Sequence, residues 1–144
     1  MKRKIGFSVL GLLLVAVAFF WLSQSGWLED FNQEQNQEFQ QFTQKGEALG
    51  RTVGQQECLD QALKSFDGCM DFRCTVGHGK FLRACLNNAS PEPAFCEDVP
   101  EFREKPTEDD KNWAKYYCRD HEIKGDGCRL LMRQQALFCS QSKH

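Results

Sequence analysis

The spacing of the eight cysteines constrains the fold of this chain more than any other sequence feature. All eight lie after residue 57, and four of the steps between neighbouring cysteines are eleven residues long. Eleven residues of α-helix make three turns plus about 20°, so both cysteines of such a step share one helix face. They also lie about 16 Å apart along the axis, which is too far for a disulfide. The spacing therefore predicts bridges between helices. The cysteines are Cys58, Cys69, Cys74, Cys85, Cys96, Cys118, Cys128 and Cys139.

Two turns of the chain would bring these cysteines together in pairs. Folding residues 58–85 about Asp71 and Phe72 places the first four in an inner and an outer pair. Folding the C-terminal part about Ile123 would place Cys118 near Cys128 and bring Cys139 within reach of Cys96, although the sequence alone does not fix the connectivity of these four. The expected disulfides are Cys58–Cys85, Cys69–Cys74, Cys96–Cys139 and Cys118–Cys128.

The first of these hairpins is similar to a known arrangement. Its paired arms of eleven residues resemble the twin Cys-x9-Cys α-hairpin of small intermembrane-space proteins, with each gap one residue longer. The resemblance is one of geometry, covers residues 58–85 only, and implies no function.

The N-terminal segment indicates the compartment. Residues 1–4 carry three basic side chains and precede an uncharged run, residues 5–22, rich in Leu, Val, Ala and Phe. Eighteen such residues just suffice to cross a bilayer, which predicts a single-pass inner-membrane protein with a cytoplasmic N-terminus and a periplasmic C-terminal domain. The alternative is a signal peptide cleaved after Ala18, although the apolar run continues to Leu22. Either interpretation exports the cysteines and favours disulfides over metal ligation.

Residues 23–54 predict a polar, amphipathic helical stalk. The segment is dominated by glutamine and glutamate, but five apolar side chains recur on one helical face. An isolated polar helix of this length is marginal in water, so we expect this stripe to contact a second copy, a partner protein or the chain's own disulfide domain. The stripe, which we treat as the candidate partner-binding set, is Phe31, Phe39, Phe42, Leu49 and Val53.

Three glycines follow one another at every fourth position of the same segment. In a helix, Gly46, Gly50 and Gly54 would form a smooth face that another backbone can approach. The alternative is that they only loosen the stalk, because each glycine lowers helix propensity by roughly 1 kcal/mol.

Residues 55–144 predict a small all-α domain of two disulfide-bonded helical hairpins. Helices are expected at about 55–66, 80–89, 107–121 and 128–140, because apolar residues recur there at helical spacing and no segment alternates with period two. The core positions expected in the last helix are Leu130, Leu131, Ala136, Leu137 and Phe138.

No motif for catalysis or for a cofactor stands out. The chain lacks Cys-x-x-Cys, a nucleophile elbow, a phosphate loop and a zinc-protease motif, so no enzyme, catalytic residue or cofactor is expected. Cys74 with His78, and Cys118 with His121, have ligand-like spacing, but a bridged cysteine cannot bind a metal, and no metal site is expected. Beyond Lys4 the net charge is −5 and no basic stripe occurs, which excludes nucleic acid as an expected partner.

These exclusions predict a membrane-anchored extracytoplasmic structural or assembly subunit that binds another envelope protein. The alternative is a redox or metal-handling assembly factor of the envelope. Five aromatic residues in the C-terminal half either cover a thin core or form a protein-binding surface. They are Phe95, Phe102, Trp113, Tyr116 and Tyr117.

Overall fold

The computed structural model describes residues 11–21 and 26–142, and every regular element in these ranges is helical. The all-α, disulfide-bonded fold class is therefore confirmed for the described part of the chain. The chain divides into two compact units, residues 1–36 and residues 37–144.

In the first unit, residues 11–21 form a helix with strongly exposed apolar side chains, including Leu12, Phe19 and Trp21. Among the described residues, no helix combines the length and the apolar character that crossing a bilayer requires. The predicted span, residues 5–22, extends beyond the described residues at both ends, and it stays a prediction. Helix α2, Trp27–Gly50, continues into the second unit and bears out the predicted stalk helix.

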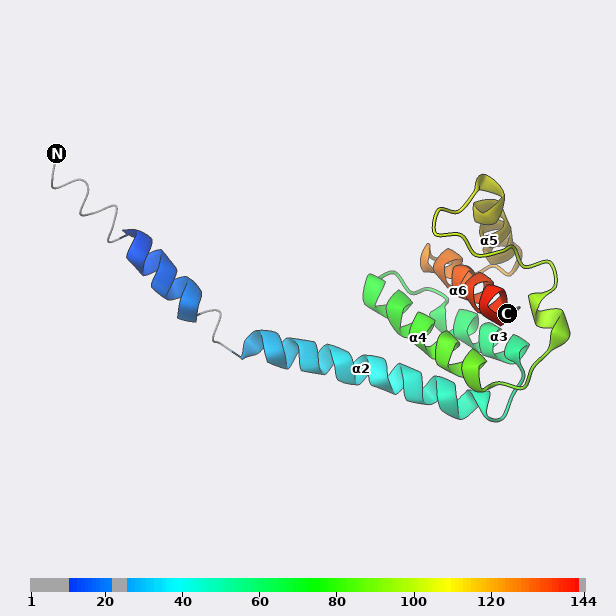
Figure 1. Ribbon diagram of the computed structural model, residues 1–144, viewed down its shortest axis with the longest axis horizontal. Coiled ribbons are helices and arrows are strands. Elements are labelled where there is room, and N and C mark those ends of the chain that lie inside the picture. The colour runs from blue at the N-terminus through cyan, green and yellow to red at the C-terminus, as the bar shows by residue number, and fades with distance from the viewer. Residues whose placement is uncertain (1–10, 22–25, 143–144) are drawn as a thin grey trace. The chain divides into compact units, whose positions relative to one another are not determined.

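Helices α3, Gln55–Phe66, and α4, Phe72–Asn88, form the first hairpin (Figure 1). The turn between them follows from local chemistry, because Gly68 adopts a φ of 83° and the Asp71 side chain caps α4 by accepting a hydrogen bond from the Cys74 backbone.

Helix α4 begins eight residues before the predicted start at residue 80. Gly77 and Gly79 precede the predicted start, and glycine has a low helix propensity, but both lie inside α4. Gly77 has a tertiary reason to be there: a Cβ atom at this position would lie 2.6 Å from the Phe42 ring. Packing against the stalk therefore outweighs the low helix propensity of glycine.

The C-terminal part consists of the 3₁₀-helix η1, Pro93–Cys96, and helices α5, Glu108–Asp120, and α6, Gly127–Ser142. A capping box formed by Thr107 and Asp110 starts α5. Helix α6 packs against α3, α4 and α5, and its inner side contributes Leu131 and Met132 to the core. Two of the expected core residues differ. Leu130 is 49% exposed, because it lies on the outer side of α6, and Leu137 is half-buried outside the core cluster, where it lines a hollow between α4 and α6.

Four disulfides connect these elements, and they join the same pairs that the two folded hairpins predict. One joins α3 to α4, one closes the turn between them, one joins η1 to α6, and one joins α5 to α6. They are Cys58–Cys85, Cys69–Cys74, Cys96–Cys139 and Cys118–Cys128, with Cα–Cα distances from 5.4 to 6.3 Å.

The stalk helix lies alongside α4 through its glycines. A Cβ atom on Gly46 would lie 2.3 Å from the Phe81 carbonyl oxygen, and one on Gly50 would lie 2.4 Å from that of Cys85. The backbones of α2 and α4 can approach this closely only because glycine has no side chain. The glycines of α2 therefore form a surface that packs against α4, and they do not merely loosen the stalk. The end of the stalk is fixed as well, because the Ser90 backbone donates a hydrogen bond to the Val53 carbonyl at 3.0 Å.

A side chain at position 50 should detach the stalk from α4. We expect Gly50→Ala to lower the free energy of unfolding by about 1–3 kcal/mol, since the new methyl group meets backbone rather than a flexible side chain. Urea denaturation measures this change, and limited proteolysis should cleave residues 37–53 faster. Gly79→Ala is the matched control: it has no atom within 4 Å of the new Cβ and should be stabilising. Equal effects of the two substitutions would contradict the docked stalk.

Candidate functional site

An apolar cleft of about 440 Å³ lies between α5, α6 and the segment that joins η1 to α5. We refer to it as the cleft. Charged side chains surround it, but its inner lining is aromatic, aliphatic and proline-rich. The apolar lining residues are Pro100, Phe102, Pro106, Trp113, Ala114, Leu130 and Ala136.

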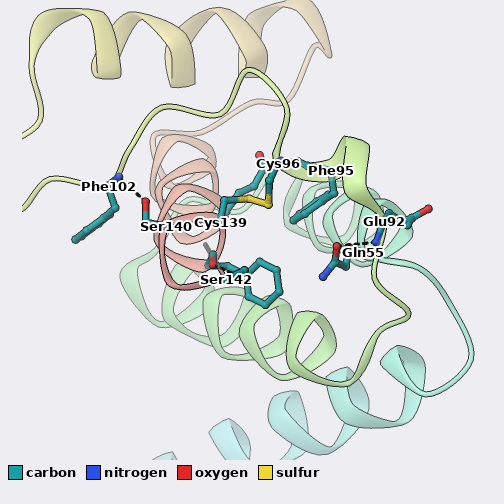
Figure 2. Close-up of a disulfide and its surroundings, with 10 residues drawn as sticks. Gln55, Glu92, Phe95, Cys96, Phe102, Cys139, Ser140 and Ser142 are labelled. Atoms are coloured by element: carbon teal, nitrogen blue, oxygen red, sulfur yellow. Dashed lines mark hydrogen bonds between the residues drawn. A yellow bond between two sulfur atoms is a disulfide. The ribbon is translucent and has the colours of Figure 1, made fainter. Parts of the chain in front are cut away.

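The segment that covers the cleft is held on α6 by side chain to backbone hydrogen bonds. The Phe102 backbone donates to Ser140 Oγ at 2.8 Å, close to the Cys96–Cys139 bridge (Figure 2). Arg133 Nη2 donates to the Arg103 carbonyl oxygen at 3.0 Å, and the Arg133 guanidinium lies 5.1 Å from the centre of the Phe102 ring. A bridge and two hydrogen bonds thus fix an irregular, proline-containing segment without secondary structure of its own.

The charges at the rim of the cleft are largely paired. Arg103 contacts Asp110 at 3.2 Å, and Arg129 pairs with Asp126. The hydrogen bond from the Thr107 backbone, with a further contribution from Arg103, lowers the pKa of Asp110 below its ordinary value. Asp110 therefore stays ionised at neutral pH and holds the start of α5 and the covering segment together.

A second hollow of about 430 Å³, which we refer to as the groove, runs between α4 and α6. Phe102, Leu130 and Arg133 line both the cleft and the groove, so the two adjoin on α6. Phe72, at the end of the groove, is 77% exposed, and the neighbouring Met70 is 90% exposed. Met70, Phe72 and Leu130 also line one further hollow, which connects the two exposed side chains with α6. The cleft and the groove, with Met70 and Phe72, form one surface that we call the α6 face.

The predicted partner-binding stripe lies elsewhere, against the chain's own α4 and core. The Phe42 ring lies edge-on to His78 with 5.1 Å between the ring centres, and the Lys80 ammonium lies 5.3 Å from the centre of the Phe39 ring. Leu49 and Val53 pack against the core. The side chain of Phe31 is outside the described residues. The stripe therefore has an intramolecular contact, which is one of the three partners considered, and binding of a second protein by it stays a prediction.

His78 is buried at the contact between the stalk and the first hairpin. It is 8% exposed, and its ring lies between those of Phe42 and Phe66. Burial lowers the pKa of His78 below its ordinary value of 6.5, because the apolar surroundings disfavour the charged form.

The residues with ligand-like spacing do not assemble into a metal site in the part of the chain that is described. Cys74 and Cys118 are both bridged, and there is no free cysteine. No group of three or more His, Cys, Asp or Glu side chains gathers there at distances suited to a metal ion. His121 instead stacks on Tyr117 with 4.0 Å between the ring centres.

Of the five aromatic residues in the C-terminal half, some cover the core and others line the exposed surface. Phe95 is buried in the core, and Tyr117 is half-buried, with burial as the main cause that raises its pKa. Phe102 and Trp113 line the cleft, and Tyr116 is 47% exposed.

Sequence reasoning missed the α4 side of this surface. The helical spacing of Phe72, Val76, Lys80 and Arg83 would have indicated this surface, but only if the helix had been predicted to start at residue 72. Comparisons with protein-family models, curated proteins and solved structures find no match to this chain. The function is therefore inferred from the residues and the geometry of the α6 face.

Acid should destabilise the fold through His78. Since the folded state lowers the pKa of this residue, the unfolded chain binds the proton more readily. Its contribution to stability is therefore complete above about pH 6.5 and is lost as the pH falls through the lowered pKa. We expect the urea concentration at the unfolding midpoint to decrease when the pH is lowered from about 7.5 to about 5.5.

The matched control is His78→Gln, which keeps a polar side chain but cannot take up a proton in this range. The decline between the two pH values should be smaller in this variant. An equal decline in both proteins would show that other groups cause it.

Proposed function

We propose that this protein is a non-enzymatic, membrane-anchored extracytoplasmic subunit that binds another envelope protein through the α6 face. The observation that carries the proposal is the α6 face itself, where Met70, Phe72 and Leu130 are exposed around one hollow and Leu130 also lines the aromatic cleft. Contiguous exposed apolar surface on a folded domain marks an interaction site, and aromatic and arginine side chains concentrate binding energy.

The rigidity of this surface supports a binding role. Disulfides join α6 both to η1 and to α5, and Arg133 and Ser140 hold the covering segment. A surface that is already ordered loses little conformational entropy on binding, which favours recognition of a partner over a closing lid.

The proposed location rests on the N-terminal segment. Residues 5–22 are uncharged and follow three basic residues, and the apolar side chains described between residues 11 and 21 are exposed. Apolar side chains of this number on one exposed helix require burial in a bilayer or against protein. A single span there would place both hairpins in an oxidising compartment, in agreement with four disulfides.

A redox or metal-handling role is the weaker alternative. Such a role needs a reactive thiol pair or thiolate ligands, whereas all eight cysteines are bridged. No observation on the described residues favours it over protein binding.

The binding role is tested by photocrosslinking in the cells that produce the protein. A photoreactive phenylalanine analogue at position 130 should yield a covalent adduct with a defined envelope protein, because this side chain lies at the centre of the α6 face. The same analogue at Lys64, which is exposed on α3, is the matched control and should yield none. Absence of an adduct at position 130, or the same adducts from both positions, would contradict the proposal.

The anchor is tested by extraction of membranes with alkaline carbonate. The full-length protein should stay in the membrane pellet, and a Leu13→Arg and Val15→Arg double variant should be released, since each arginine at mid-span disfavours insertion by about 2.5–3.5 kcal/mol. A mature protein that begins at Phe19 would show cleavage instead of anchoring.

A further inference from the structure

We infer that the groove between α4 and α6 binds an acidic amphipathic helix of about three turns, contributed by the partner protein. This inference rests on the proposed function and names the chemistry of the segment bound. Three independent features of the groove support it: its shape, an unexplained glycine and its charge.

The shape of the groove matches a helix. The α4 wall presents Phe72, Val76, Gly79 and Arg83 in steps of four, three and four residues, and the α6 wall presents Leu130, Gln134 and Leu137 in steps of four and three. Both walls are therefore helix faces, and the α4 wall is about 16 Å long, which equals three helical turns. A hollow between two helix faces accepts the apolar side of a third helix through anchors at i, i+3, i+4 and i+7.

Gly79 provides the second feature. In residues 37–142, the other glycines inside helices each have an atom within 3.0 Å of the place where a Cβ would lie, as Gly46, Gly50, Gly77 and Gly127 show. Gly79 has nothing within 4 Å, although it lies in the middle of α4 and lines the groove. Glycine there weakens the helix without any intramolecular packing reason. A helix that approaches closely from outside supplies such a reason.

Charge identifies the occupant. Lys80, Arg83 and Arg133 line the groove, and no acidic side chain lines it. Among the described residues, no carboxylate pairs with any of these three cations. Arg83 is exposed, Arg133 donates to the Arg103 carbonyl oxygen, and the Lys80 ammonium lies over the Phe39 ring at the edge toward the stalk. This contrasts with the cleft, where Arg103 and Arg129 are paired, and with the net charge of −5 beyond Lys4. A ligand with an apolar stripe and flanking carboxylates is complementary to the groove.

The position of the cations favours a helix over an anionic membrane surface. Arg83 lies on α4 and Arg133 lies across the groove on α6, so two guanidinium groups flank an apolar floor. A flat anionic surface would meet the acidic remainder of the protein at the same time, which opposes docking.

The test uses the full-length protein in neutral detergent and labelled synthetic peptides. The probe peptide is a three-turn helix with leucine at i, i+3, i+4 and i+7 and glutamate at the flanking positions. The control peptide has glutamine in place of each glutamate. Fluorescence anisotropy should show saturable binding of the probe peptide, at least tenfold weaker binding of the control peptide, and weaker binding of the probe at high salt.

Variants of the protein locate the binding site. Arg83→Glu should weaken binding of the probe peptide at least tenfold, whereas Lys64→Glu, the same charge change on exposed α3, should leave it unchanged. Gly79→Leu should reduce binding at least tenfold by filling the groove without lowering the melting temperature, because no atom lies within 4 Å of the new Cβ and leucine favours the helix more than glycine does. Gly79→Ala should raise the melting temperature.

Several results would overturn the inference. Equal binding of the two peptides would mean that the groove recognises apolar surface alone, and no binding of either would mean that it is not a helix site. Binding of phosphatidylglycerol vesicles that is lost in Arg83→Glu, without peptide binding, would assign the groove to a membrane. Self-association that is lost in the same variant would assign it to a second copy. A positive crosslink from position 130 together with any of these results would leave the proposed function standing and reject only the acidic helix.

Discussion

The bridge between Cys58 and Cys85 is the contact on which the rest of residues 37–142 depends. Both cysteines are fully buried, and their bond holds α3 against α4 at the centre of the core. The backbone of Cys85 is also the surface that the stalk approaches, because Gly46 lies against its nitrogen and Gly50 against its carbonyl oxygen. One residue therefore joins the hairpin and the stalk, and the position of α4 determines where the stalk and the groove lie.

The disulfides explain how a thin core can support so much exposed apolar surface. Burial of Met70, Phe72 and Leu130 would have strengthened the core, yet the chain leaves them outside. Each bridge adds about 2–4 kcal/mol to the free energy of unfolding, chiefly by restricting the unfolded chain. With four bridges, the hydrophobic core has to supply less of the total stability. The α6 face can then be shaped for a partner instead of for stability.

The two faces of α4 serve different purposes. Toward the stalk, Gly46 and Gly50 let the backbones meet, and His78 is enclosed by aromatic rings. Toward α6, the helix presents Gly79 with open space above it and Arg83 in solvent. On the stalk side of α4, the glycines of α2 permit a contact within the chain. On the side toward α6, Gly79 of α4 marks, in our inference, a contact with another protein.

The sequence alone determined the helical class and the partition into hairpins, because both follow from local chemistry. The eleven-residue cysteine steps require bridges between helices, and apolar residues at helical spacing mark the four helices expected in residues 55–144. The cysteine pairs expected from the folded hairpins are the pairs that the structure contains.

Only the tertiary structure decided which surfaces are buried. Helical periodicity placed Leu130 in the core, but α6 is covered by other helices on one side only, and Leu130 lies on the other. The start of α4 likewise could not be predicted from local sequence. Gly77 has a low helix propensity, but its packing under the Phe42 ring favours the helix. The α6 face arises from residues that are distant in sequence, such as Phe72, Phe102 and Leu130, and their proximity depends on long-range packing that no local pattern encodes.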